Sequence, residues 1–196
     1  DALLGMIGVF GALLTVYCTS MIYGSLRTVD IWHTGLTPAC FLLFSLAGGL
    51  LLACIFSGAL VLKLSAMLLL LVALIAKMLW RNRSRTLVPR STPESATGLG
   101  VIGKVKLFER PHALDNYLTR EMGFRVARKH AEKLWLIALL SGVVLPLAAL
   151  LAAMALGNGV PAQIALGVGI AGHMLGIFVE RWLFFAEARH AVMNYY

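Results

Sequence analysis

Five long runs of apolar residues limit what this chain can fold into. A helix needs about 20 mostly apolar residues to cross the hydrocarbon core of a bilayer. We expect spanning helices over residues 2–23, 38–56, 59–80, 134–156 and 162–185. Only 13% of the residues are charged, whereas soluble domains carry about 25%. The sequence therefore predicts an all-α, polytopic transmembrane helical bundle, forming one membrane domain over residues 1–196.

Basic residues are concentrated on one side of the predicted bundle. Twelve of the 17 Lys and Arg residues lie between Arg81 and Lys133. Loops rich in Lys and Arg remain in the cytoplasm, and the segments 24–37 and 81–133 alternate onto the same side as the C-terminus. We therefore expect these three segments to be cytoplasmic. The lipid bilayer, and not nucleic acid, is the partner that this charge pattern indicates.

The predicted cytoplasmic loop, residues 81–133, has two parts of different character. Its first part is rich in Pro, Ser, Thr and Gly and should be irregular, whereas residues 115–135 have a helical pattern. Leu118, Met122 and Val126 fall on one face of that helix. It is either a surface helix leading into the next span or an interfacial helix that packs on a partner or on anionic headgroups.

Motifs of soluble enzymes are missing from the sequence. It has no P-loop, no GxSxG and no HExxH. Cys18, Cys40 and Cys54 lie in apolar stretches without CxxC spacing, which is typical of packing residues. We therefore predict no catalytic residue and no metal site in this chain.

Ionisable residues inside the predicted spans are the next candidates. Lys63 and Lys77 lie near the two ends of the third span, where they are expected to snorkel to the interface. His173 lies in the middle of the last span, and intramembrane ionisable groups are functional candidates by default. It could be an axial ligand of haem b, although the chain offers no second His at similar depth. The alternative is a neutral imidazole bonded to a backbone carbonyl.

Polar residues at the cytoplasmic ends of the spans could serve a quinone site or make ordinary interfacial contacts. Glu180 and Glu187 lie two turns apart on one helix face, so they could form a proton path or an ion pair with the basic loop. In the first cytoplasmic loop, Arg27 and His33 could donate hydrogen bonds to a quinone headgroup, and Trp32 could provide an apolar wall. The alternative is an ordinary interfacial loop.

Three stretches carry long motifs: residues 22–38, 97–134 and 180–196, the second of which contains YLTREMGFRVARKHA. They resemble the membrane anchor subunit of dimethyl sulfoxide reductase and its relatives. Such anchors have eight helices, so the resemblance implies that this chain is the C-terminal part of one. They lie in the bacterial inner (cytoplasmic) membrane and exchange electrons with ubiquinone or menaquinone. Their partners are an iron–sulfur subunit and a molybdopterin catalytic subunit, which hold the clusters and the molybdopterin. Members of this type typically lack haem.

The predicted orientation narrows the expected function. A cytoplasmic basic loop could dock the iron–sulfur subunit through Arg125, Arg128 and Lys129. Sulfite-oxidising relatives have catalytic subunits that face the cytoplasm, which favours a sulfite dehydrogenase anchor that passes electrons to quinone. The alternatives are a dimethyl sulfoxide reductase-type anchor that oxidises quinol and a purely structural anchor. A transporter is disfavoured because the spans carry few polar groups.

Overall fold

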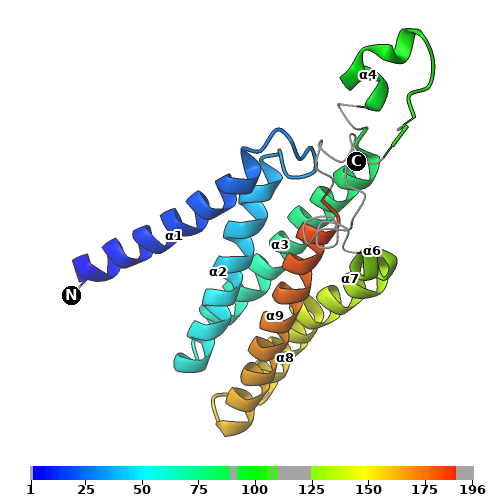
Figure 1. The fold of residues 1–196 in the computed structure, drawn as a ribbon. Coiled ribbons are helices and arrows are strands. Elements are labelled where there is room, and N and C mark those ends of the chain that lie inside the picture. The colour runs from blue at the N-terminus through cyan, green and yellow to red at the C-terminus, as the bar shows by residue number, and fades with distance from the viewer. Residues whose placement is uncertain (1, 89–91, 107, 110–124, 189–196) are drawn as a thin grey trace.

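Helices make up the regular structure of this protein in a computed structural model that describes residues 2–88, 92–106, 108–109 and 125–188. The described residues contain no strand. Five long helical segments are apolar enough to cross a membrane, as predicted (Figure 1). They are α1 (Ala2–Gly24), α2 (Leu36–Phe56), α3 (Leu60–Thr86), the continuous segment Ala131–Ala155, and α9 (Val160–Ala186). The short helices are α4 (Pro93–Thr97), η1 (Leu99–Val101) and α6 (Arg125–Lys129).

Two helical hairpins form the core of the bundle. One is α2–α3, and the other joins the segment Ala131–Ala155 to α9. Helix α2 contacts both α3 and α9, and the second hairpin also packs on α3, so the four segments surround a common interior. Helix α1 contacts α2 but leans away from the other helices (Figure 1). Its spanning window buries no residue inside the structure, so α1 contributes little to this interior.

The fourth spanning segment is interrupted near Pro146, a residue type that kinks helices. It consists of α7 (Ala131–Leu139), the π-helical turn η2 (Leu140–Val144) and α8 (Leu145–Ala155). Pro146 has no N–H to bond the carbonyl of Gly142 four residues earlier. A π-helical turn at such a place is a known cause of helix bending.

Glycines allow α9 to approach η2 closely. A Cβ atom on Gly176 would lie 2.2 Å from Cα of Gly142, and one on Gly172 would lie 3.0 Å from the carbonyl oxygen of Ser141. Gly172 and Gly176 are four residues apart, the small-xxx-small spacing that brings membrane helices together. This contact holds the interrupted segment against α9.

The end of the bundle that carries residues 25–35, the end of α3 and the end of α9 is called the basic end here. Helix α3 continues beyond Trp80 to Thr86, so Arg83 and Arg85 form its last turn. At the start of the second hairpin, α6 ends at Lys129 and His130 separates it from α7. The first part of the predicted interfacial helix, residues 115–124 with Leu118 and Met122, lies outside the described residues.

Candidate functional site

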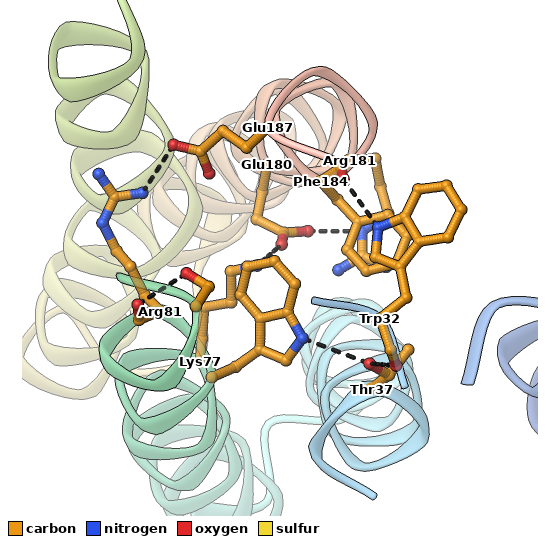
Figure 2. Close-up of polar contacts among 10 residues, drawn as sticks. Trp32, Thr37, Lys77, Arg81, Glu180, Arg181, Phe184 and Glu187 are labelled. Atoms are coloured by element: carbon orange, nitrogen blue, oxygen red, sulfur yellow. Dashed lines mark hydrogen bonds and ion pairs between the residues drawn. The ribbon is translucent and has the colours of Figure 1, made fainter. Parts of the chain in front are cut away.

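A buried ion pair joins α3 to α9 within the predicted spans. Nζ of Lys77 contacts Oε1 of Glu180, and each side chain is only 5% exposed. Nε of Arg181 donates to the other carboxylate oxygen of Glu180 (Figure 2). A buried charge needs an ion-pair or hydrogen-bond partner, because removal from water is expensive. Two cations and one carboxylate leave a net charge of +1 in this Lys77–Glu180–Arg181 cluster.

A second set of ion pairs lies one helical turn nearer the basic end. Nη2 of Arg81 donates to Glu132 of α7 at 2.8 Å, and its Nη1 lies 3.7 Å from Glu187 after α9 (Figure 2). Arg85 also contacts Glu132. Lys77, Arg81 and Arg85 follow one another at four-residue intervals, so they share a helix face. The ion pair expected for Glu187 is therefore present, with Arg81 as its partner.

Neither lysine of the third span snorkels, contrary to the expectation from sequence. Lys77 and Lys63 are each only 4% exposed. Lys77 finds Glu180 across the bundle, whereas Nζ of Lys63 donates to the carbonyl of Ala153 at 3.4 Å and to Oδ1 of Asn158 at 3.3 Å. Both partners lie on the other hairpin, and hydropathy alone carries no signal for such pairing.

A groove runs between α2 and α9 and ends at the buried cluster. Its volume is about 480 Å³, within the range of ligand sites. The α2–α9 groove is lined mainly by carbon atoms, and its walls include Phe41, Phe44, Gly48 and Gly49 of α2 and His173, Ile177, Glu180 and Arg181 of α9.

Arg181 closes the groove at the basic end. Its guanidinium lies 4.1 Å from the ring centroid of Phe41 and 4.8 Å from that of Phe184. Its Nη1 is buried and has no hydrogen-bond partner among the described residues. A guanidinium cannot release its proton in a protein, so Arg181 offers a permanent positive charge at this end.

His173 lies midway along α9 and is bonded to the interrupted segment. Its Nδ1 is 2.7 Å from the carbonyl oxygen of Gly142. Because a carbonyl can only accept, Nδ1 must carry the hydrogen. The acceptor is available because Pro146 cannot bond it. This geometry is the backbone-bonded imidazole that the sequence left as the alternative to haem ligation.

A haem does not fit the residues around His173. Nε2 of His173 faces the backbone of Gly48. A Cβ atom added to Gly48 would lie only 3.1 Å from this nitrogen. The other described histidines, His33 and His130, lie in the loop before α2 and between α6 and α7. The described residues also contain no His, Cys, Asp and Glu group suited to a metal ion.

The predicted quinone residues of the first loop mainly bond helix ends. Nε1 of Trp32 donates to the carbonyl of Phe184 at 3.0 Å (Figure 2), and the two rings stack with centroids 5.1 Å apart. Nδ1 of His33 donates to the last carbonyl of α1, that of Gly24, at 2.9 Å. Arg27 is exposed and makes no hydrogen bond or ion pair within the described part of the chain. The structure therefore brings Trp32, but not Arg27, close to the end of the groove.

The predicted docking residues also differ from one another. Arg128 donates from Nε to the carbonyl of Ala186 at 2.6 Å and from Nη2 to that of Ala188 at 2.9 Å. It thus satisfies carbonyls left over at the end of α9. Lys129 is exposed. Arg125 begins α6, and its side chain lies outside the described structure. Docking at these residues stays a prediction.

Comparison with known proteins shows the family. A family model described as "DMSO reductase anchor subunit (DmsC)" matches residues 1–102, just over half of the chain. A sulfite dehydrogenase subunit of Allochromatium vinosum is 32% identical over 202 residues, which cover 99% of this chain and 60% of that protein. No solved structure matches significantly. With five helices suited to a membrane, this multi-pass membrane protein belongs to the DMSO reductase anchor subunit family.

Proposed function

We propose that this chain anchors a molybdopterin/iron–sulfur oxidoreductase to the bacterial inner membrane and passes its electrons to quinone in the α2–α9 groove. Family membership supports the anchor role. A relative described as a sulfite dehydrogenase subunit supports sulfite as the electron source. The molybdopterin and the iron–sulfur clusters belong to the partner subunits.

The observation that carries the quinone assignment is the position of Arg181 in the groove. A quinone combines a headgroup bearing two carbonyl acceptors with a long apolar tail. The guanidinium of Arg181, whose side chain is 22% exposed and lines the groove, can donate to one carbonyl. The apolar walls of α2 and α9 can accommodate the tail. Ubiquinone and menaquinone share these features.

The length of the groove determines where the headgroup would sit. Arg181 and His173 are eight residues apart on α9, about 12 Å along a helix axis, so one quinone ring cannot contact both. We place the ring at Arg181 and the tail alongside His173. The ring then lies near the basic end, the side on which the iron–sulfur subunit is predicted to dock, and electrons need not cross the membrane.

The first loop remains a second candidate for the headgroup, as the sequence suggests. The ring N–H groups of Trp32 and His33 already donate to backbone carbonyls, which favours a supporting role for both. Of the three predicted residues, Arg27 is the one whose side chain is exposed and available to a ligand.

Blocking the groove tests the assignment. A Cβ atom on Gly49 would meet nothing within 4 Å, so Gly49→Phe can fill the groove while Gly49→Ala serves as its control. In the complex with its partner subunits, we expect Gly49→Phe and Arg181→Met to reduce quinone-linked turnover about tenfold or more. Dye-linked sulfite oxidation by the soluble subunits should persist.

Two outcomes would contradict this placement. Unchanged quinone-linked turnover in Gly49→Phe would remove the quinone from the groove. A loss confined to Arg27→Ala would place the headgroup in the first loop instead. A complex that reduces no quinone, but oxidises quinol with a sulfoxide as acceptor, would support the reductase alternative. A purely structural anchor predicts that no quinone is extracted from the purified complex.

A further inference from the structure

We propose that Glu180 delivers protons to the quinone in the α2–α9 groove and that Lys77, its ion-pair partner, supplies them. This inference rests on the proposed function, because it needs a quinone at Arg181. It goes further by naming the proton donor and the side from which the proton comes.

Glu180 lies between two separate spaces. On one side it lines the groove, next to Arg181. On the other side it lines a partly open cavity of about 20 Å³ between α2, α3, α7, η2 and α9, which Lys77 also lines. The surface of this pocket is almost entirely apolar, so the link between the two residues is the direct contact of Lys77 with Glu180. Among the ionisable side chains that line these two spaces, Glu180 is shared by both.

The charged groups around Glu180 limit which of them can exchange a proton. Lys77 faces it from α3 and Arg181 from its own helix, while Cys40 lines the groove on α2. The described residues that line the cavity from α7 and η2 have no ionisable side chain. An Arg stays protonated in proteins, whereas a buried Lys can give up its proton. Lys77 and Glu180 are therefore the pair suited to transfer.

The chemistry balances as two identical proton steps. A quinone that accepts two electrons from the partner's iron–sulfur cluster needs two protons to become quinol. In each step a proton passes from Nζ of Lys77 to Oε1 of Glu180, which contact each other. Glu180 then protonates a quinone oxygen. Lys77 recovers its proton through water from the basic end, and Arg181 keeps the reduced oxygen close.

Glu187 has a different place in this scheme from the one that the sequence suggested. It lies two turns beyond Glu180, pairs with Arg81 and is partly exposed to solvent. It does not line the cavity that Lys77 and Glu180 share. We assign it to the surface ion pairs and remove it from the proton route.

The test uses Glu180→Gln and Lys77→Arg in the assembled complex. Gln keeps the size and hydrogen-bonding capacity of Glu180, and Arg keeps the charge of Lys77 without a proton to give. We expect each to lower the quinone reduction rate roughly a hundredfold, as for loss of a general acid. The solvent deuterium isotope effect should rise and the pH profile should change. Bound quinone per complex and dye-linked activity should remain.

Further variants keep the test decisive. Glu180→Asp should recover part of the rate, which a merely structural role would not require. Glu187→Gln should retain the pH profile. Wild-type rate and pH profile in Glu180→Gln or in Lys77→Arg would overturn the proton route while the groove assignment stands. Loss of bound quinone in Gly49→Phe, measured by extraction, reports on the groove independently, so the two ideas can fail separately.

Discussion

The two ends of the bundle are packed in different ways. At the basic end the buried cluster contains aromatic residues from three elements and the first loop, among them Trp32, Phe44, Trp80 and Phe184. At the opposite end the buried cluster contains only Ala, Leu and Cys. Aromatic side chains bury large areas and carry polar edges, whereas small aliphatic residues allow helices to approach closely.

Polar contacts follow the same division. At the opposite end, the buried Lys63 side chain donates hydrogen bonds to Ala153 and Asn158 of the other hairpin. The basic end holds the Lys77–Glu180–Arg181 cluster, the mouth of the groove and the bonds from Trp32 and Arg128 to the end of α9. The opposite end therefore mainly packs the two hairpins together. The basic end concentrates the groups that could bind a ligand and transfer protons.

The largest loss of stability is expected when a buried charge at the basic end loses its partner. Lys77→Met leaves the carboxylate of Glu180 with Arg181 alone, and breaking a buried ion pair typically costs about 3–5 kcal/mol. We expect a loss of about 3 kcal/mol, since Arg181 remains, measured by thermal unfolding of the purified protein in detergent. The triple variant Lys77→Met/Glu180→Met/Arg181→Met leaves no charge of this cluster unpaired and should recover most of it. A triple variant less stable than Lys77→Met would show that unpaired charge is not the source of the loss.

A smaller loss of stability is expected from overpacking near the middle of the bundle. In Gly176→Ala the new Cβ would lie 2.2 Å from Cα of Gly142, so α9 and η2 must separate. Overpacking of this kind costs roughly 1–3 kcal/mol. Gly167→Ala is the matched control, because its Cβ meets nothing within 4 Å. Equal unfolding temperatures for the two variants would contradict the close contact.

The sequence predicts the spans of this bundle but not the polar contacts between them. Hydropathy identifies the five spans because helix length and bilayer thickness match. Pro146 also marks the interruption, and the carbonyl that it frees at Gly142 could have been matched to His173. The Lys77–Glu180 pair could not be predicted, because apolar residues surround both and hydropathy does not define the rotation of one helix against another. Nor could the capping roles of Trp32 and Arg128, which depend on where α9 ends in space.

A smaller effect is expected at the opposite end. Lys63 has two long hydrogen bonds and no carboxylate partner among the residues that the structure describes. Lys63→Met should therefore cost about 1 kcal/mol, the net worth of such bonds, and leave quinone turnover unchanged. Unfolding in detergent gives the first quantity and turnover of the complex the second. A loss as large as that in Lys77→Met would erase the contrast between the ends.

The smallest effect on stability is expected at Lys129, and it sharpens the predicted docking face. Lys129→Glu changes an exposed side chain, so the free energy of unfolding should stay within about 0.5 kcal/mol of the wild type. Charges at the rim of an interface act mainly on association and are screened by salt. The reversal should therefore weaken binding of the iron–sulfur subunit most at low ionic strength. Arg128→Glu cannot answer this question alone, because it also removes two bonds to the end of α9. If Lys129→Glu binds the subunit with unchanged affinity and salt dependence, the docking face lies elsewhere on the basic end.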